Sequence, residues 1–135
     1  MNREELIAEC AKVRKGLELA AKHNLNRDEM FYLFPRGCCG PASEVLACWL
    51  PRQGEDDRYE YVHGWRNDEG HTWLEYNGLI IDITADQFPE ITEKVIVTSD
   101  RSFHNQFEED LRYVIPKNSS IYSINVLLDF LRKTI

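Results

Sequence analysis

Two adjacent cysteines, Cys38 and Cys39, lie between two glycines in the segment RGCCGPAS, residues 36–43. A structural cysteine needs only an apolar pocket, whereas a reactive one needs a helix N-terminus, an accessible turn and a histidine within reach. A histidine and a carboxylate follow in the segment HTWLEYNGLIIDIT, as His71 and Asp82. A thiol, an imidazole and a carboxylate in this order have the side chains that nucleophilic catalysis by cysteine requires.

The dipeptide Asn77-Gly78 relates His71 to Asp82. Asn-Gly between alternating residues is the strongest short-range signal of a two-residue β-hairpin turn. Trp73 then faces Asp82, and His71 is the diagonal neighbour of Asp82 on the same face, about 7–8 Å away between backbones. We therefore predict a hydrogen bond that fixes the imidazole tautomer and gives the carboxylate in the apolar strand LIIDIT a partner. The opposite, apolar face should lie on the core: Thr72, Leu74, Tyr76, Leu79, Ile81 and Ile83.

Cys39 is the candidate nucleophile. Apolar residues recur at helical spacing over residues 39–50 and nearly all round, so a buried helix should begin at this cysteine. Gly37 and Gly40 permit a tight turn and close backbone approach, and the free N–H groups of the first turn favour a thiolate. The alternative is an inert buried cysteine, which we predict for Cys10 and Cys48 on apolar helix faces. Cys38 is interpreted as a bystander that lines the site.

The remaining elements define the fold class. Helical spacing predicts a helix over residues 2–23, a short helix from Asn26 that ends before Pro35, and a C-terminal helix from residue 118 or 119. Alternation predicts strands at residues 59–65, 71–76, 79–84 and 94–99, while residues 101–113 stay unassigned. Helices followed by an antiparallel sheet and a closing helix indicate one α+β domain over residues 1–135.

Composition limits the function classes. Of the 135 residues, 43% are hydrophobic and 29% charged, which is typical of a globular domain rather than a disordered one. A formal net charge of -7 disfavours nucleic acid as a partner. The chain shows no apolar run that would span a membrane and no signal-peptide pattern. We expect no metal and no cofactor, because the cysteines lack paired CxxC spacing, and we expect a reducing, cytoplasmic location.

The sequence resembles the papain-like superfamily, and within it the transglutaminase-like and arylamine N-acetyltransferase-like branch. The papain-type pattern of a glycine, a small residue, the nucleophilic cysteine and a later serine is similar to GCCGPAS, residues 37–43, and selects Cys39. The segment HTWLEYNGLIIDIT looks like the strands that carry the histidine and the aspartate. The resemblance covers about half the chain, residues 36–87, and implies a papain-like core with thiol acyl-transfer chemistry.

Two features depart from that superfamily. Papain-like peptidases carry a glutamine shortly before the cysteine for the oxyanion hole, and the segment MFYLFPRG has none. The hole would need the Cys39 N–H together with Gln87, the Trp73 indole or a backbone amide, next to Gly40. The chain also has no second lobe to form an extended peptide cleft. Both departures argue against general proteolysis.

The other histidines are weaker candidates. His63 lies on the strand face of Tyr59, Tyr61 and Trp65, and no turn in the sequence places a carboxylate opposite it. His23 and His104 are expected to be exposed to solvent.

The residues thus predict a hydrolase or acyltransferase in which Cys39 attacks an acyl carbon, His71 transfers the proton and Asp82 orients His71. Its substrate would be a protein, a peptide or a small amide or acyl compound. The first alternative is a catalytically idle papain-like domain that serves as a binding or immunity-type module. A weaker alternative is a metal site that uses Cys38 or Cys39 with His71 and Asp82.

Overall fold

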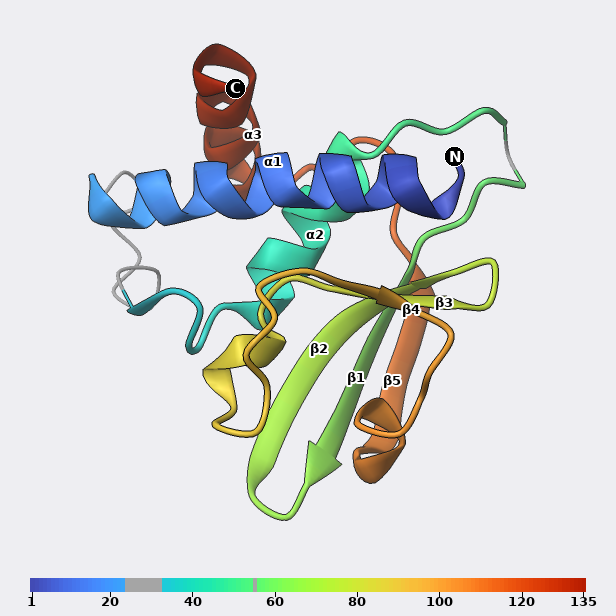
Figure 1. Ribbon diagram of the computed structural model, residues 1–135. Helices are drawn as coiled ribbons and strands as arrows, with labels where there is room; N and C mark the ends of the chain where they lie inside the picture. Colours follow the sequence, from blue (N-terminus) through green and yellow to red (C-terminus); the bar gives the residue numbers. More distant parts are fainter. Residues whose placement is uncertain (24–32, 55) are drawn as a thin grey trace.

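The computed structural model describes residues 1–23, 33–54 and 56–135. Over these residues, α-helices gather above one antiparallel five-stranded sheet, so the predicted α+β class is confirmed (Figure 1). The strand order is β4-β3-β2-β1-β5, an open sheet. The elements are α1 (Arg3–Lys22), α2 (Cys39–Trp49), β1 (Glu60–Arg66), β2 (Glu69–Tyr76), β3 (Leu79–Asp82), η2 (Ala85–Gln87), β4 (Ile96–Thr98), η3 (His104–Gln106), β5 (Glu108–Val114) and α3 (Tyr122–Thr134).

Helix α1 is the helix predicted over residues 2–23. Asn2 caps it by accepting a hydrogen bond from the Glu5 N–H, while the Glu5 carboxylate accepts one from the Asn2 N–H. Its buried apolar stripe is Leu6, Cys10, Val13, Leu17 and Ala20, whereas Ile7, which has the same helical spacing, is only partly buried. The short helix expected from Asn26 falls almost wholly in residues 24–32, outside the described residues.

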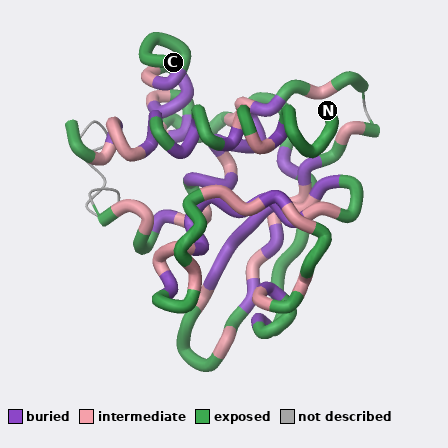
Figure 2. The backbone as a smooth tube through the Cα atoms, viewed as in Figure 1, coloured by how far each residue is buried: buried purple, intermediate pink, exposed green. Residues whose placement is uncertain are grey.

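Helix α2 places Cys39 beside the sheet. It begins at Cys39 as predicted, two residues after Gly37, whose φ of 71° lies in the left-handed region that favours glycine. Its side chains are mostly buried because the helix packs against β2 on one side and α3 on another (Figure 2). Burial on several sides is the reason for its nearly continuous apolar sequence.

The β2–β3 hairpin has the predicted register. Asn77 and Gly78 both have positive φ values, 49° and 77°, as a two-residue turn of this kind requires, and Leu74 pairs with Ile81. Strand β3 ends at Asp82, two residues earlier than predicted.

This early end exposes one edge of β2. The pairing of β2 with β3 covers Leu74–Tyr76, so the edge of β2 at His71 and Thr72 has no β3 neighbour. The N-terminus of α2 lies at this free edge of β2, where Cys39 is hydrogen-bonded to Thr72.

Both faces of the hairpin are covered, whereas the sequence predicted a core on one face only. The main core lies between the helices and the sheet and includes Leu74, Tyr76 and Ile81. A second apolar cluster lies on the opposite face and consists of Val62, Trp73, Ile80, Phe88 and Phe107. The chain between β3 and β5 folds back over this face and supplies Phe88 and Phe107.

Strand β5 accounts for part of the segment that the sequence left unassigned. It pairs with β1 at the edge of the sheet, and all its residues are exposed, so it shows no clear alternation. Strand β4 is shorter than predicted, and α3 begins a few residues later than predicted. Among the described residues, no helix has the length and apolarity needed to cross a membrane.

Candidate active site

Cys39 differs from the other three cysteines in its accessibility. All four are free thiols, but Cys10, Cys38 and Cys48 are buried and Cys39 is partly exposed. Cys39 is the first residue of α2, where backbone N–H groups have no partner within the helix and the dipole favours a negative charge. The prediction of core positions for Cys10 and Cys48 is confirmed.

His71 and Asp82 form the predicted hydrogen bond. His71 Nε2 lies 2.6 Å from Asp82 Oδ2, and both side chains are almost completely buried. The other carboxylate oxygen, Oδ1, accepts a hydrogen bond of 3.0 Å from the backbone N–H of Thr84. The diagonal relation across the hairpin therefore brings the two groups into direct contact.

His104 is a further member of this cluster, and its predicted exposure is wrong. The side chain is 2% exposed, and its Nε2 lies 2.7 Å from Asp82 Oδ2, the same oxygen that His71 engages. The error arose because His104 belongs to η3, inside the segment without a clear period. The signal in the sequence was Phe103 and Phe107 on either side of it, since aromatic neighbours indicate a buried turn.

The thiol of Cys39 is hydrogen-bonded to His71. Burial alone raises the pKa of this thiol, but the hydrogen bond and positive charge of His71, with hydrogen bonds from Thr72, bring the pKa below its ordinary value. His71 Nε2 is held by Asp82, so Nδ1 is the nitrogen that faces the thiol side. The arrangement favours a thiolate paired with an imidazolium.

The imidazole of His71 is held in its protonated form. Burial lowers the pKa of His71, but the charge and hydrogen bond of Asp82, followed by the contact with Cys39, raise it to about 9. Asp82 behaves in the opposite way: burial raises its pKa, and His71 and His104 together bring it well below the usual range. The pKa shifts of Cys39, His71 and Asp82 thus all favour the charged forms: a thiolate, an imidazolium and a carboxylate.

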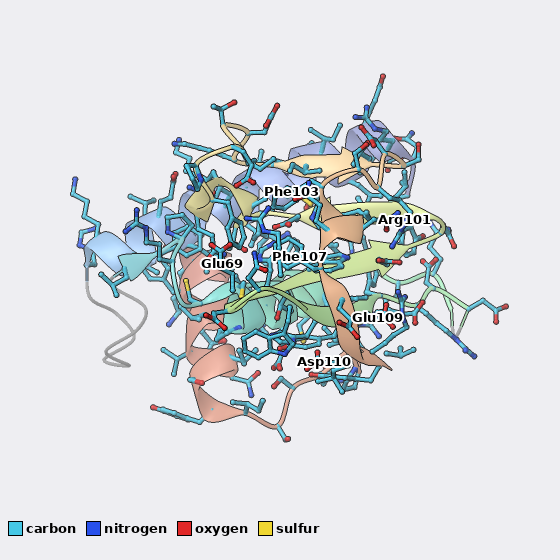
Figure 3. All side chains as sticks on the ribbon, turned by 90° about the horizontal axis from the view of Figure 1, so that it is seen from below. Glu69, Arg101, Phe103, Phe107, Glu109 and Asp110 are labelled. Atoms are coloured by element: carbon cyan, nitrogen blue, oxygen red, sulfur yellow. The ribbon has the colours of Figure 1, made fainter. Side chains whose placement is uncertain are left out.

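Aromatic rings enclose the buried part of the site. Phe88 meets the His71 ring edge to face at 5.0 Å, and Phe107 and Trp73 lie at 5.6 and 5.7 Å between ring centres. Phe103 and Phe107 are labelled near the middle of the sheet in Figure 3 and are themselves 5.4 Å apart. This cluster keeps water from the bond between His71 and Asp82 and fixes the ring.

The structure distinguishes the two predicted oxyanion donors. Gln87 lies in η2, and its Nε2 is 3.4 Å from His71 Nδ1, on the thiol side of the ring; it also donates to the Thr84 carbonyl at 3.1 Å. The Trp73 indole instead donates to Glu75 at 3.0 Å, so this N–H is already engaged. Gln87 is the better placed of the two side chains.

The two remaining predicted site residues flank Cys39. Cys38 is 1% exposed and caps α2, so it supports the turn rather than facing solvent. Gly40 leaves little space beside it, because a Cβ there would lie 3.0 Å from the hydroxyl oxygen of Tyr61.

A metal ion is the alternative use of the buried cluster. Among the described residues, His71, Asp82 and His104 place ligand atoms within 4.8 Å of one another, and no cysteine belongs to this group. However, both imidazoles contact one carboxylate oxygen at 2.6 and 2.7 Å, which are hydrogen-bond lengths. Ligands about 2.0–2.2 Å from a common zinc ion would lie farther apart than this. The geometry fits shared protons better than a metal.

His63 has a carboxylate partner that the sequence did not reveal. Its Nδ1 lies 2.7 Å from Asp110 of β5, which also accepts a hydrogen bond from the Trp65 indole at 2.9 Å. The sequence did not reveal Asp110 because it lies at a register shift in the edge strand β5; Figure 3 labels this residue. This pair is exposed, and no contact with a thiol accompanies it.

Comparisons of the chain with family models, with curated proteins and with solved structures found no match.

Proposed function

We propose that the protein is a thiol-dependent hydrolase or acyltransferase that acts on a carboxamide, peptide, isopeptide or other acyl bond. One observation carries the proposal: the partly exposed thiol at the start of α2 is hydrogen-bonded to an imidazole whose other nitrogen is held by a buried carboxylate. A structural cysteine needs none of these contacts.

The reaction follows from the positions of the three groups. The Cys39 thiolate attacks the carbonyl carbon, and the carbonyl oxygen takes up the negative charge. The Cys39 N–H and the Gln87 amide are the donors that we assign to that oxygen. His71 gives its Nδ1 proton to the leaving amine or alcohol, which departs and leaves a thioester on Cys39. His71 then accepts a proton from water or an acceptor amine, whose attack releases the acyl product and restores the thiolate.

The fold and the location belong to the same proposal. A nucleophile at a helix start, a histidine on one strand and an aspartate on the next support a papain-like core. Four free cysteines support a reducing compartment such as the cytoplasm.

The test is the pH dependence of iodoacetamide alkylation at each cysteine, measured by peptide mass spectrometry on the native protein and on His71→Ala. We expect Cys39 to react fast well below pH 8, and to react in the variant like an ordinary thiol with a pKa of about 8.5. Cys39→Ala shows which peptide carries the fast reaction.

If Cys39 is no more reactive than Cys10, the catalytic proposal fails. The idle binding or immunity-type module then becomes the better function, with Asp82 as a structural partner of the two histidines.

A further inference from the structure

A small cavity near Cys39 is lined by the carboxylate of Glu44, which forms no ion pair among the described residues. Tyr61 touches the first turn of α2, since its hydroxyl oxygen would lie 3.0 Å from a Cβ at Gly40. The Tyr61 ring stacks on the Tyr113 ring at 4.8 Å, and the Tyr113 hydroxyl donates to Glu44 at 3.4 Å. An aromatic wall thus connects the thiol to Glu44.

Glu44 lies at the mouth of a cavity of about 200 Å³ between α2 and the connection from β5 to α3. The cavity contains polar groups and apolar surface but no basic side chain; its lining is Glu44, Cys48, Tyr113, Ile115, Pro116 and residues 118–121. Lys117, the basic residue in this connection, donates instead to the carbonyl oxygens of Cys48 and Leu50 at 3.5 and 3.2 Å.

Glu44 has no cation of its own within the part of the chain that the structure describes. Tyr113 is its hydrogen-bond donor, and burial raises the pKa of the Glu44 carboxyl. A half-buried carboxylate without an ion pair is costly, and a positively charged group that entered the cavity would remove that cost. The rings of Tyr61 and Tyr113 add a favourable surface for a cation.

The spacing suits one substrate. Glu44 follows Cys39 by five positions in α2, a rise of about 7.5 Å with a rotation of about 140°, so the two side chains lie on different faces of the helix. Tyr61 and Tyr113 form the path between them, and a substrate would span this path with a long cationic side chain. We propose that the cavity at Glu44 and Tyr113 binds the ammonium or guanidinium group of a substrate whose acyl carbon lies at Cys39. This inference rests on the proposed function and specifies its substrate class as cationic.

The test compares two thiol reagents with the same leaving group and opposite charge, the trimethylammonioethyl and the sulfonatoethyl methanethiosulfonates, each rate being divided by the rate of the same reagent with a small free thiol. In each case the Cys39 thiolate attacks the reagent's sulfenyl sulfur, a disulfide forms and methanesulfinate leaves. The ratio of the two rates at Cys39 is measured by peptide mass spectrometry at low ionic strength, for the wild type and for Glu44→Gln. Glu93→Gln is the matched control, because it removes the same charge from an exposed side chain that does not line the cavity at Glu44.

We expect Glu44→Gln to lower the ratio of cationic to anionic rates by about fivefold, since a carboxylate within about one Debye length acts with opposite sign on the two reagents. Glu44→Lys should lower it further, and Glu93→Gln should leave it unchanged. An unchanged ratio in both Glu44 variants overturns the inference.

These outcomes separate the inference from the proposed function, because methanethiosulfonates also modify ordinary accessible thiols. Fast iodoacetamide alkylation of Cys39 with no effect of Glu44 keeps the catalytic proposal and removes the cation site. A fivefold effect of Glu44 with an ordinary Cys39 thiol keeps the cation site and removes the catalytic proposal. A Cys39 that resists every reagent removes both.

Discussion

Asp82 is the residue on which the site depends, because its buried carboxylate accepts hydrogen bonds from two imidazoles and one backbone N–H. Such a charge is tolerable only when several donors replace the lost water. The Asp82 carboxylate stabilises the protonated form of His71. His104 has no contact with Cys39 among the described bonds, so its role is to anchor the carboxylate that orients His71.

This role predicts the effect of His104→Phe. Phenylalanine keeps a ring beside Trp73, 4.8 Å away, but removes the donor to Asp82. The free energy of unfolding at neutral pH should fall by about 2–3 kcal/mol, the usual cost of an unsatisfied buried charged group. Urea titrations of the wild type and the variant measure this difference.

The loss of stability caused by His104→Phe should depend on pH. His104 helps to lower the pKa of folded Asp82, so its stabilisation is present above the unfolded carboxyl pKa of about 3.9 and is lost as pH falls through the folded pKa. The deficit of His104→Phe should therefore shrink below about pH 4. His63→Phe, which breaks the exposed pair with Asp110, is the control and should cost less than about 1 kcal/mol. Equal costs in both variants would argue against an anchoring role.

At the scale of elements, the parts of the site that the sequence predicted are those set by local geometry. The turn at Asn77-Gly78 fixed the hairpin register, and the register fixed the contact of His71 with Asp82. The start of α2 followed from its glycines and from apolar spacing. Each of these depends on neighbours a few residues apart.

The parts that the sequence did not predict depend on long-range folding. His104 and Phe107 reach the site because the chain between β3 and β5 crosses the second face of the sheet. Burial there does not repeat with a fixed period, so neither helical spacing nor alternation indicates it. Strand β5 is exposed on both faces and lacks the alternation that marks a strand.

The approach of β5 to β1 is sensitive to one glycine. A Cβ at Gly64 would lie 2.8 Å from the Glu108 carbonyl oxygen and 3.1 Å from the Phe107 Cβ. Gly64→Ala should therefore separate the strands at the register shift and displace Phe107 from the cluster around His71. We expect a loss of about 1–3 kcal/mol in the free energy of unfolding, measured by urea titration.

Gly78→Ala separates this steric effect from backbone strain. Gly78 has a positive φ but open space around its Cα, so alanine there should cost about 1 kcal/mol and leave His71 unaffected. Backbone amide exchange in β5 provides a second measurement, because Gly64→Ala should accelerate it and Gly78→Ala should not. A Gly64→Ala protein with wild-type stability and exchange would contradict the close approach.

At the scale of the whole molecule, the pKa shifts of Cys39 and His71 influence how stability depends on pH. His71 has a pKa raised to about 9 when folded and about 6.5 when unfolded, so its stabilisation is complete below pH 6.5 and is lost as pH rises to 9. Cys39 has a lowered pKa when folded, so its stabilisation is present above the unfolded value of about 8.5 and is lost as pH falls.

These two slopes have opposite signs, because the folded protein holds more protons on His71 and fewer on Cys39 than the unfolded chain does. Cys39→Ser removes the thiolate and leaves the slope of His71, which Asp82 still holds protonated. The variant should therefore lose stability relative to the wild type as pH rises, by up to about 1.4 kcal/mol per pH unit. Urea titrations at pH 6.5, 7.5 and 8.5 measure the two slopes, and the other histidines cancel in the difference. Cys48→Ser is the control: burial raises the pKa of Cys48, which stays a thiol in the folded protein, so its slope should equal that of the wild type until the unfolded thiol begins to ionise at about pH 8.5. Parallel slopes for Cys39→Ser and the wild type would mean that Cys39 is an ordinary thiol in the folded protein.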